Sequence, residues 1–278
     1  MAFGRHRRAS PGFKRPARGE PLISFQGLHK AFGQKHVFEA LDLEIREGET
    51  LTVIGGSGTG KSVLLKCLIG LLEPDQGHIV FQGQELTGFA EEDFREVRRK
   101  VAMVFQGSAL FDSLSVGENI SYPLHEHFPE MEAEEVAARV AQRLAMVNLP
   151  GIEAMRPADL SGGMRKRVGL ARAIATDPEV ILWDEPTTGL DPLSTRIIDE
   201  LIISMKEKLG CTSIVVTHDM DSAFAVSDRI AMLANRKIVQ VGTVEEMKGS
   251  RVKEVRAFFD ARKTRRPRVT GAHKVMEP

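Results

Sequence analysis

The hydrophobic residues of this chain gather in short runs that are separated by glycine and polar positions. Four runs are apolar at nearly every position, at 51–54, 101–105, 180–183 and 213–216. Continuous apolar runs of this length are typical of parallel strands that are buried on both faces of a sheet. Leu41, Leu43 and Ile45 alternate with acidic residues instead, which predicts a half-buried strand of antiparallel type.

Helical spacing takes over between the predicted strands. One apolar helical face is predicted for Leu64, Leu65, Leu68, Ile69 and Leu72. A second pattern spans 132–149, with an apolar face made of Val136, Val140, Leu144 and Val147. Strands that alternate with helices predict an α/β fold, in which a mainly helical insert occupies about 107–170.

Composition places the chain among ordinary globular proteins. Of its 278 residues, 42% are hydrophobic and 27% are charged, which excludes bulk disorder. Cys67 and Cys211 both fall in apolar runs, so we expect free thiols in a reducing compartment. The N-terminal residues lack the apolar core of a secretory signal, and no run of about 18 apolar residues predicts a membrane span. We therefore expect a soluble, cytosolic protein.

The net charge is zero, but the charges are unevenly distributed. Residues 1–19 carry six basic and no acidic side chains, and 251–278 carries nine basic and three acidic ones. The stretch 20–250 is acidic, with 23 basic and 35 acidic residues, which is not the pattern of a general nucleic-acid binder.

The two basic ends have more than one interpretation. Residues 1–20 mix Arg, Pro and Gly with little to bury, so we expect them to be disordered. Their charges suit contact with anionic lipid headgroups or a merely solubilising role. The segment 251–268 has apolar residues at helical spacing, which fits docking on a partner or on the chain's own core.

A glycine-rich segment follows the first apolar run and opens the first predicted helix. It satisfies G-x-x-x-x-G-K-[ST] with Gly55, Gly56, Ser57, Gly58, Thr59, Gly60, Lys61 and Ser62. Glycines let backbone N–H groups turn toward one anion, and the helix N-terminus that follows from Val63 favours negative charge. We expect Lys61 to reach the β- and γ-phosphates of a nucleotide and the Ser62 hydroxyl to ligate Mg²⁺. A plain glycine-rich turn is the simpler alternative.

Two acidic residues at the end of the third apolar run indicate the second half of a nucleotide site. Asp184 stands where the phosphate-loop fold places its Mg²⁺-side carboxylate, and Glu185 is placed to accept a proton from the attacking water. His218 follows the fourth run, so it lies at the same sheet edge and is a candidate γ-phosphate contact. Solvated edge charges and a structural histidine are the alternatives.

A further candidate anion site lies far along the chain from the phosphate loop. Ser161 is placed as a helix N-cap, and Gly162 and Gly163 leave backbone N–H groups bare at the positive end of that helix. Two phosphate half-sites in one chain suggest a dimer.

Taken together, these motifs resemble those of ABC-transporter ATPases. The stretch LSGGM at 160–164, continued as RKRVGLARAI, is similar to the family signature, which faces the ATP held by a partner copy. By the same resemblance, Gln106 contacts Mg²⁺ and senses a membrane partner, and GLD at 189–191 is the D-loop. His218 is the implied switch histidine, and Phe32 the aromatic that stacks on adenine. A packed hairpin aromatic is the alternative for Phe32.

The resemblance covers roughly 22–248 and implies a fold. We expect a P-loop NTPase core, a mainly parallel sheet flanked by helices, with an N-terminal antiparallel β subdomain and a helical signature subdomain. The ATP-binding domain would span 21–250, with the helical subdomain at about 107–170, followed by a basic extension at 251–278. ATP and Mg²⁺ are the implied cofactors.

Two positions depart from the common family pattern. Met164 ends the signature where glutamine is usual, and a thioether cannot replace the hydrogen bonds of an amide. Val63 stands where Thr or Ser is common, so one hydroxyl donor to phosphate is lost while its backbone N–H remains. Three segments nevertheless look like the Mla-type ATPases, which drive lipid transport with MCE-domain proteins in double-membrane bacteria and plastids: 58–66, 103–124 and 160–174.

The resemblance therefore implies a membrane complex. Two copies of this chain would join two copies of an integral permease and an MCE-domain lipid-binding protein, with a small STAS-domain subunit in some complexes and no nucleic acid. The chain would lie peripherally on the cytoplasmic side of the inner membrane. An apolar surface for the permease, or alternatively packing within the helical region, is expected of Ala109, Leu110, Phe111, Leu114 and Val116.

Other functions of the same family stay open at this stage. The catalytic motifs also serve transporters of amino acids or lipoproteins, and the Mla-like segments alone separate these cargoes. Soluble ABC proteins of translation or repair usually carry two cassettes, long coiled coils or zinc motifs, which this sequence lacks. A non-catalytic regulatory cassette is disfavoured because Lys61, Asp184, Glu185 and His218 are intact.

Overall fold

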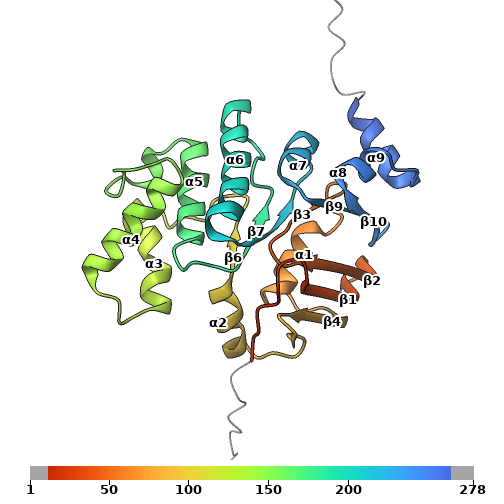
Figure 1. The fold of residues 1–278 in the computed structure, drawn as a ribbon, viewed down its shortest axis with the longest axis horizontal. Coiled ribbons are helices and arrows are strands. Elements are labelled where there is room, and N and C mark those ends of the chain that lie inside the picture. The colour runs from red at the N-terminus through yellow and green to blue at the C-terminus, as the bar shows by residue number, and fades with distance from the viewer. Residues whose placement is uncertain (1–11, 264–278) are drawn as a thin grey trace, which may run out of the picture.

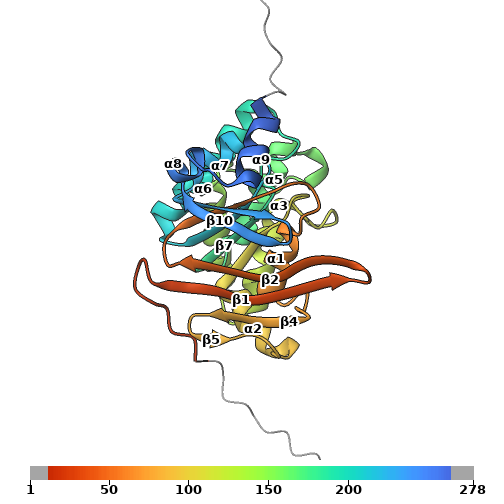
Figure 2. The same ribbon diagram turned by 90° about the vertical axis from the view of Figure 1, so that its right-hand side faces the viewer.

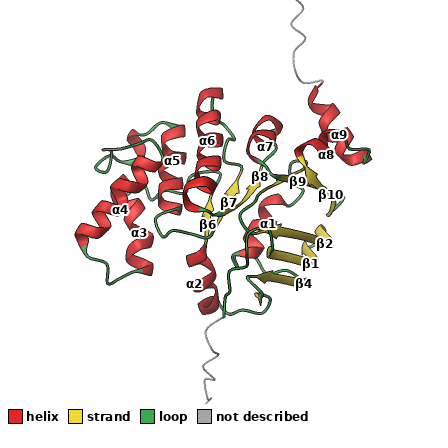
Figure 3. Cartoon of the chain, in the orientation of Figure 1, coloured by secondary structure: helices red, strands yellow, loops and turns green. Residues whose placement is uncertain are grey.

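The structure is a computed structural model that describes residues 12–263. Its strands form two sheets, and helices surround the larger one (Figures 1 and 3). The strands are β1 (Pro21–Phe32), β2 (Lys35–Arg46), β3 (Thr50–Ile54), β4 (Gln76–Phe81), β5 (Gln84–Glu85), β6 (Val101–Val104), β7 (Val180–Asp184), β8 (Thr212–Val216), β9 (Arg229–Ala234) and β10 (Lys237–Thr243). The helices are α1 (Lys61–Leu68), α2 (Glu91–Lys100), α3 (Val116–His127), α4 (Ala133–Met146), η1 (Pro157–Asp159), α5 (Gly162–Ala173), α6 (Pro192–Leu209), α7 (Met220–Val226), α8 (Val244–Lys248) and α9 (Lys253–Lys263).

The larger sheet contains all four continuous apolar runs. Its strand order is β10-β9-β3-β8-β7-β6, and every neighbouring pair except β10–β9 is parallel. All residues of β3, β7 and β8 are buried, which explains their mostly apolar sequences. Trp183 of β7 is fully buried and donates its ring N–H to Ser213 Oγ at 3.2 Å. Because the strands are parallel, their carboxyl ends share one edge of the sheet.

The smaller sheet is antiparallel and has the order β2-β1-β4-β5. In β2, Leu41, Leu43 and Ile45 are buried while the acids between them are exposed, so the predicted half-buried antiparallel strand is confirmed. Figure 2 shows this sheet below β10, and residues of both sheets share one hydrophobic core with α1. The expected α/β fold with an antiparallel β portion is confirmed.

Helix α1 ends earlier than its apolar spacing predicted. It stops at Leu68, and Gly70 takes a φ of +70°, which does not continue a right-handed helix. Leu72 therefore lies beyond the helix, although it still packs against the same core.

Helices α3, α4 and α5 lie between β6 and β7 in the chain and form the group at the left of Figure 1. The predicted face of α4 is confirmed, because Val136, Val140, Leu144 and Val147 all lie in the core of this group. The helix itself ends at Met146 rather than at 149.

Residues 12–20 depart from the disorder that we expected for residues 1–20. The Phe13 ring lies 5.5 Å from the Phe81 ring, and Arg15 donates to Glu47 Oε1 at 2.9 Å and to the Gly210 carbonyl at 2.7 Å. The segment is fixed because an aromatic ring and a guanidinium both find partners on the domain. Residues 1–11 lie outside the described residues.

The C-terminal helix α9 docks on the chain's own core. Val255 is fully buried, and Phe258 and Phe259 pack against a cluster that includes residues of α7, α8 and β9. For 251–268 we had left open docking on a partner or on the chain's own core. The described part of this segment docks on the chain's own core, and residues 264–278 lie outside the described residues. No helix within residues 12–263 is long and apolar enough to cross a membrane.

Candidate active site

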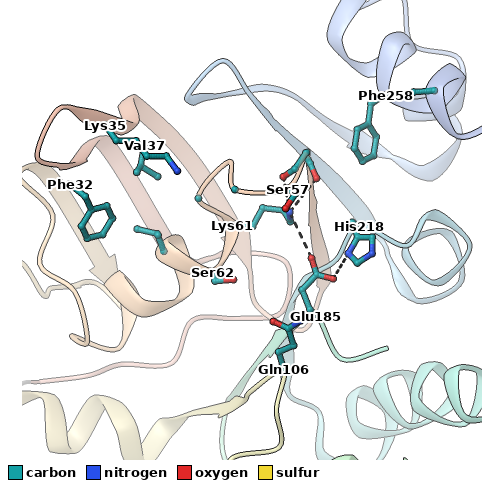
Figure 4. A pocket seen from close by; sticks show the side chains of 16 residues that line it. Phe32, Lys35, Val37, Ser57, Lys61, Ser62, Gln106, Glu185, His218 and Phe258 are labelled. Atoms are coloured by element: carbon teal, nitrogen blue, oxygen red, sulfur yellow. Dashed lines mark hydrogen bonds and ion pairs between the residues drawn. The ribbon is translucent and has the colours of Figure 1, made fainter. Parts of the chain in front are cut away.

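The phosphate-loop residues line a cavity of about 750 Å³ at the carboxyl edge of the larger sheet (Figure 4). The loop connects the end of β3 to the start of α1. Two of its glycines are required by their surroundings: a Cβ on Gly60, whose φ is +106°, would lie 2.3 Å from Val37, and one on Gly55 would lie 2.5 Å from the Leu233 carbonyl oxygen. Gly60 offers no side chain to cap α1, so the first N–H groups of this helix suit an anion.

Lys61 places its amine inside this loop. Its side chain is only 6% exposed, and Nζ donates to the carbonyl oxygens of Gly55 and Gly56 at 3.2 and 3.1 Å. The same amine lies 3.8 Å from Glu185 Oε1. A cation held between the loop and a carboxylate is well placed for phosphate oxygens, because hydrogen bonds between two charged groups are the strong ones.

Ser62 and Asp184 meet at the sheet edge, as the sequence predicted. The Ser62 hydroxyl donates to Asp184 Oδ1 at 2.5 Å, and Asp184 is buried. Gln106, which follows β6, lines the same cavity. Hydroxyl, carboxylate and amide oxygens fit Mg²⁺, which keeps waters and phosphate oxygens as its other ligands. Within residues 12–263, no group of three or more His, Cys, Asp or Glu side chains is arranged to hold a metal ion.

Glu185 occupies an uncommon backbone conformation, with a φ of +51°. Its Oε1 faces Lys61, whereas Oε2 lies 2.6 Å from His218 Nδ1 and accepts the Thr188 hydroxyl at 2.9 Å (Figure 4). The Glu185 side chain is 13% exposed and that of His218 is 51% exposed. A carboxylate that is oriented by a cation, an imidazole and a hydroxyl is suited to accept a proton from a water in the cavity.

The outer wall of the cavity on one side comes from the smaller sheet. It is formed by Phe32, at the end of β1, with Lys35 and Val37 of β2. The Phe32 ring is 48% exposed, and Lys30 Nζ lies 5.4 Å from its centroid, so this ring is not a packed hairpin aromatic. Its open face is available for stacking a base.

The opposite wall comes from α9 and was missed by sequence reasoning. Phe258 and Ala261 line the cavity, and Figure 4 shows the Phe258 ring across the phosphate loop from Phe32. The helical spacing of apolar residues was the one signal in the sequence, and it reports burial but not the element against which a helix packs.

The predicted signature half-site lies away from this cavity. Ser161 caps α5 by accepting the Met164 N–H at 3.2 Å, and Gly162 and Gly163 form the first turn of the helix. In Figure 1, α5 stands apart from α1, so a single chain does not bring the two predicted phosphate half-sites together. The Met164 side chain packs against the helical core.

The expected apolar surface after Gln106 is only partly exposed. Phe111 is 43% exposed and Tyr122 of α3 is 51% exposed, with ring centroids 5.0 Å apart, and the Arg172 guanidinium lies 5.7 Å from the Phe111 ring. Ala109 is also exposed, and Leu110 and Leu114 are half-buried. The prediction of a surface position was wrong for Val116, because this residue starts α3 and is fully buried in the helical core.

Comparisons with known proteins agree with this geometry. Residues 38–188 match the protein family described as ABC transporter. The intermembrane phospholipid transport system ATP-binding protein MlaF of Haemophilus influenzae is 39% identical over 228 residues, covering 81% of this chain and 85% of that protein. The probable ribonucleotide transport ATP-binding protein mkl of Mycobacterium tuberculosis is 40% identical over 241 residues, covering 87% of this chain and 67% of that protein.

Solved structures place the same fold in a dimer. The dimeric, post-hydrolysis structure of the ATP-binding cassette MJ0796 bound to ADP and Pi superposes with a TM-score of 0.74 and 30% identity, covering 80% of this chain and 99% of that one. The phosphate loop, the acidic strand end, the matched family and this fold lead to one conclusion. The chain belongs to the ABC transporter family, as an ATP-hydrolysing, ATP-binding subunit.

Proposed function

We propose that this ABC ATPase powers the transport of phospholipid through a separate membrane permease. The catalytic geometry is common to many cargoes, so the cargo rests on other support. That support is the similarity to MlaF, whose name states phospholipid transport and of which 85% is covered, together with the Mla-like segments 58–66, 103–124 and 160–174. The similarity to mkl, which is named for ribonucleotide transport, makes ribonucleotide the first alternative cargo to test.

The observation that carries the catalytic part of the proposal is the position of Glu185 beside the phosphate loop. Its carboxylate lies 3.8 Å from Lys61 Nζ and 2.6 Å from His218 Nδ1. In our proposal, the loop N–H groups and Lys61 bind the β- and γ-phosphates, and Phe32 stacks on the adenine. Glu185 then accepts the proton of the attacking water, while His218 contacts the γ-phosphate. The remaining proposed phosphate contacts come from the loop itself: Gly55, Gly56, Ser57, Gly58, Thr59, Gly60, Ser62 and Val63.

Ser62, Asp184 and Gln106 would hold Mg²⁺. When bound, the ion would neutralise charge on the phosphate oxygens. Asp184 and Ser62 are already joined by a hydrogen bond of 2.5 Å, so the two ligands face one point.

A second copy of the chain would complete each ATP site. The separation of α5 from the phosphate loop within one chain and the dimeric cassette structures both support this arrangement. Ser161, Gly162 and Gly163 of each copy would bind the γ-phosphate held by the other. ATP binding would close the dimer and hydrolysis would reopen it, which moves the attached permease.

The permease would contact the exposed Phe111–Tyr122 pair. This contact would hold the chain at the cytoplasmic side of the inner membrane. The adjacent Arg172 guanidinium adds a positive charge to this apolar surface. An MCE-domain lipid-binding protein and a STAS-domain subunit are the further partners that we propose for the complex.

Purification of the tagged full-length chain from detergent-solubilised membranes tests this function. We expect an integral permease to co-purify, mass spectrometry to find bound phospholipid, and phospholipid in the surrounding bilayer to stimulate phosphate release. Phe111→Asp is the matched control. It replaces an exposed ring with a charged carboxylate, which should detach the permease without changing hydrolysis by the isolated chain. A complex that binds no phospholipid but responds to ribonucleotide or amino acid would contradict the cargo. Recovery of ribosomes or DNA instead of a permease would contradict the transporter.

A further inference from the structure

A buried lysine links the signature helix to the loop that carries Glu185. Lys166 lies in α5, five residues after the Ser161 cap, and is only 9% exposed. Its Nζ donates to the carbonyl oxygens of Pro186 and Thr188 at 2.8 Å each, and the Glu185 carbonyl oxygen lies 3.5 Å away. An ammonium group has three donors, and in this structure all three find backbone acceptors on the segment that follows β7.

The burial of this charge is unfavourable by itself. Removal from water lowers the pKa of Lys166, and the nearby negative charge of Glu185 opposes that effect. A buried ammonium persists where hydrogen bonds and a neighbouring charge compensate it, and here both compensating groups belong to the 185–188 segment. The segment also needs support, because Glu185 has a φ of +51° that few non-glycine residues adopt.

Lys166 does not line the nucleotide cavity, so it acts through other residues. We propose that Lys166 is a positioning residue for ATP hydrolysis, which fixes the 185–188 segment, and through it the Glu185 carboxylate, to helix α5. This inference rests on the proposed roles of Glu185 and Ser161. Helix α5 of one chain would then meet the ATP of the partner and also orient Glu185 of its own chain. The two ATP sites of a dimer would thus be mechanically linked.

Two variants of Lys166 and one control variant, all in the full-length chain, test the inference. Lys166→Met keeps the length of the side chain but removes every donor, and misplacement of a reacting group by about 1 Å costs roughly 100-fold in rate. We therefore expect kcat to fall by about this factor while KM for ATP stays near the wild-type value. Lys166→Arg keeps the charge and should restore part of kcat. Lys208→Met, at an exposed position near the end of α6, is the matched control and should behave as wild type.

A second readout separates positioning from simple support of the helix. In a Glu185→Gln background, Lys166→Met should still form the ATP-dependent dimer on size-exclusion chromatography, because the N-terminus of α5 is unchanged. The inference would be overturned if Lys166→Met abolished turnover in the otherwise wild-type chain and also abolished the dimer in the Glu185→Gln background. Lys166 would then only hold α5 in place. Wild-type kcat in Lys166→Met would also overturn it.

Two further outcomes keep the test decisive. If Lys166→Met does not fold, Lys166→Gln, which keeps two donors, replaces it and should lower kcat about tenfold without raising KM. Wild-type kcat in Lys166→Gln would then overturn the inference. Failure of the proposed function is separate, because it would show as full turnover in Glu185→Gln alone, whatever Lys166 does.

Discussion

Among single residues, Lys61 combines two tasks at the phosphate loop. Its amine donates to the loop carbonyls of Gly55 and Gly56 and supplies a positive charge to the cavity. We expect Lys61→Ala to weaken ATP binding and to lower hydrolysis by roughly 100-fold or more, the usual effect of removing a group that stabilises transition-state charge. Phosphate release and titration with a fluorescent ATP analogue measure the two effects, with exposed Lys208→Ala as the control. Hydrolysis at a rate near that of wild type would contradict the assignment of this loop.

Glu185→Gln should separate ATP binding from hydrolysis. The amide keeps the size of the side chain, so the loop, Mg²⁺ and adenine contacts should survive. It cannot accept the proton of water, and general-base assistance typically contributes about 10²–10⁴-fold. We expect slow phosphate release and a closed, ATP-bound dimer on size-exclusion chromatography. Full turnover would mean that another group, such as His218, is the base, and loss of ATP binding would mean that Glu185 is structural.

Asp184→Asn should give a different result from Glu185→Gln, although the residues are adjacent. Asp184 accepts the Ser62 hydroxyl at 2.5 Å, and the amide would remove the negative charge beside it. We therefore expect weaker retention of Mg²⁺ and hence weaker binding of the Mg–ATP complex. A titration of ATP binding against Mg²⁺ concentration measures this effect. An unchanged Mg²⁺ requirement would exclude Asp184 from the ion site.

Asp199 of α6 gives the stability of the chain a pH dependence. Burial raises the pKa of its carboxyl to about 6, with a smaller contribution from Asp219, although Ser222 donates a hydrogen bond to it. The folded chain thus holds this proton more tightly than the unfolded chain. This contribution to stability is complete below about pH 4 and is lost as the pH rises through about 6.

Asp199→Asn should remove that component of the pH dependence and make the chain more stable than wild type at pH 7. Urea unfolding of both proteins between pH 4 and pH 8 measures the difference, and Glu207→Gln, an exposed acid on the same helix, is the control. A difference between wild type and variant that does not change with pH would contradict the assignment.

At the scale of an element, the start of α1 depends on one glycine. Gly60→Ala would place a Cβ 2.3 Å from Val37 Cγ1 and 2.8 Å from the Phe38 ring, in addition to the strain of φ at +106°. Gly58 has a φ of +73° but nothing within 4 Å of its Cβ position, so Gly58→Ala shares the strain without the clash. We expect Gly60→Ala to be less stable than Gly58→Ala by about 1–3 kcal/mol, the usual cost of overpacking. Equal unfolding midpoints would show that the loop relaxes freely.

The sequence predicted those elements whose pattern depends on local burial. The four apolar runs became β3, β6, β7 and β8, and in β3, β7 and β8 every residue is buried, which favours a mostly apolar sequence. The motif residues that follow these strands came together for the same reason, since parallel strands deliver their carboxyl ends to one edge.

The remaining features depend on contacts between distant segments, which periodicity does not report. Phe258 lines the cavity because α9 docks on α7 and α8, and Phe13 is fixed because Phe81 lies beside it. Lys166 looks like one of several basic residues on a helix, and its burial follows from the path of the 185–188 segment. Such residues could not be found from spacing alone.

For the whole molecule, the proposed sharing of two separated half-sites would make hydrolysis a property of two chains. Ser161→Arg should block hydrolysis while leaving ATP binding to the phosphate loop largely intact, because the bulky side chain would obstruct the partner's γ-phosphate. Ser161→Ala is the control, since it removes the cap of α5 at a cost of about 1 kcal/mol without adding bulk. Phosphate release measured over a range of protein concentrations tests the requirement for two chains. Full activity of monomeric protein at high dilution would contradict the shared site.

The lone tryptophan gives this molecule an optical probe of its catalytic sheet. Trp183 is the one indole in the sequence, and it immediately precedes the two acids of the site. Its ring is shielded from water and bonded to Ser213 of the neighbouring strand, so its fluorescence reports the contact between β7 and β8. Separation of these strands would expose the indole and move its emission to longer wavelength, without interference from a second tryptophan. The opening of β7 and β8, which precede Glu185 and His218 in the chain, can therefore be followed in unlabelled protein.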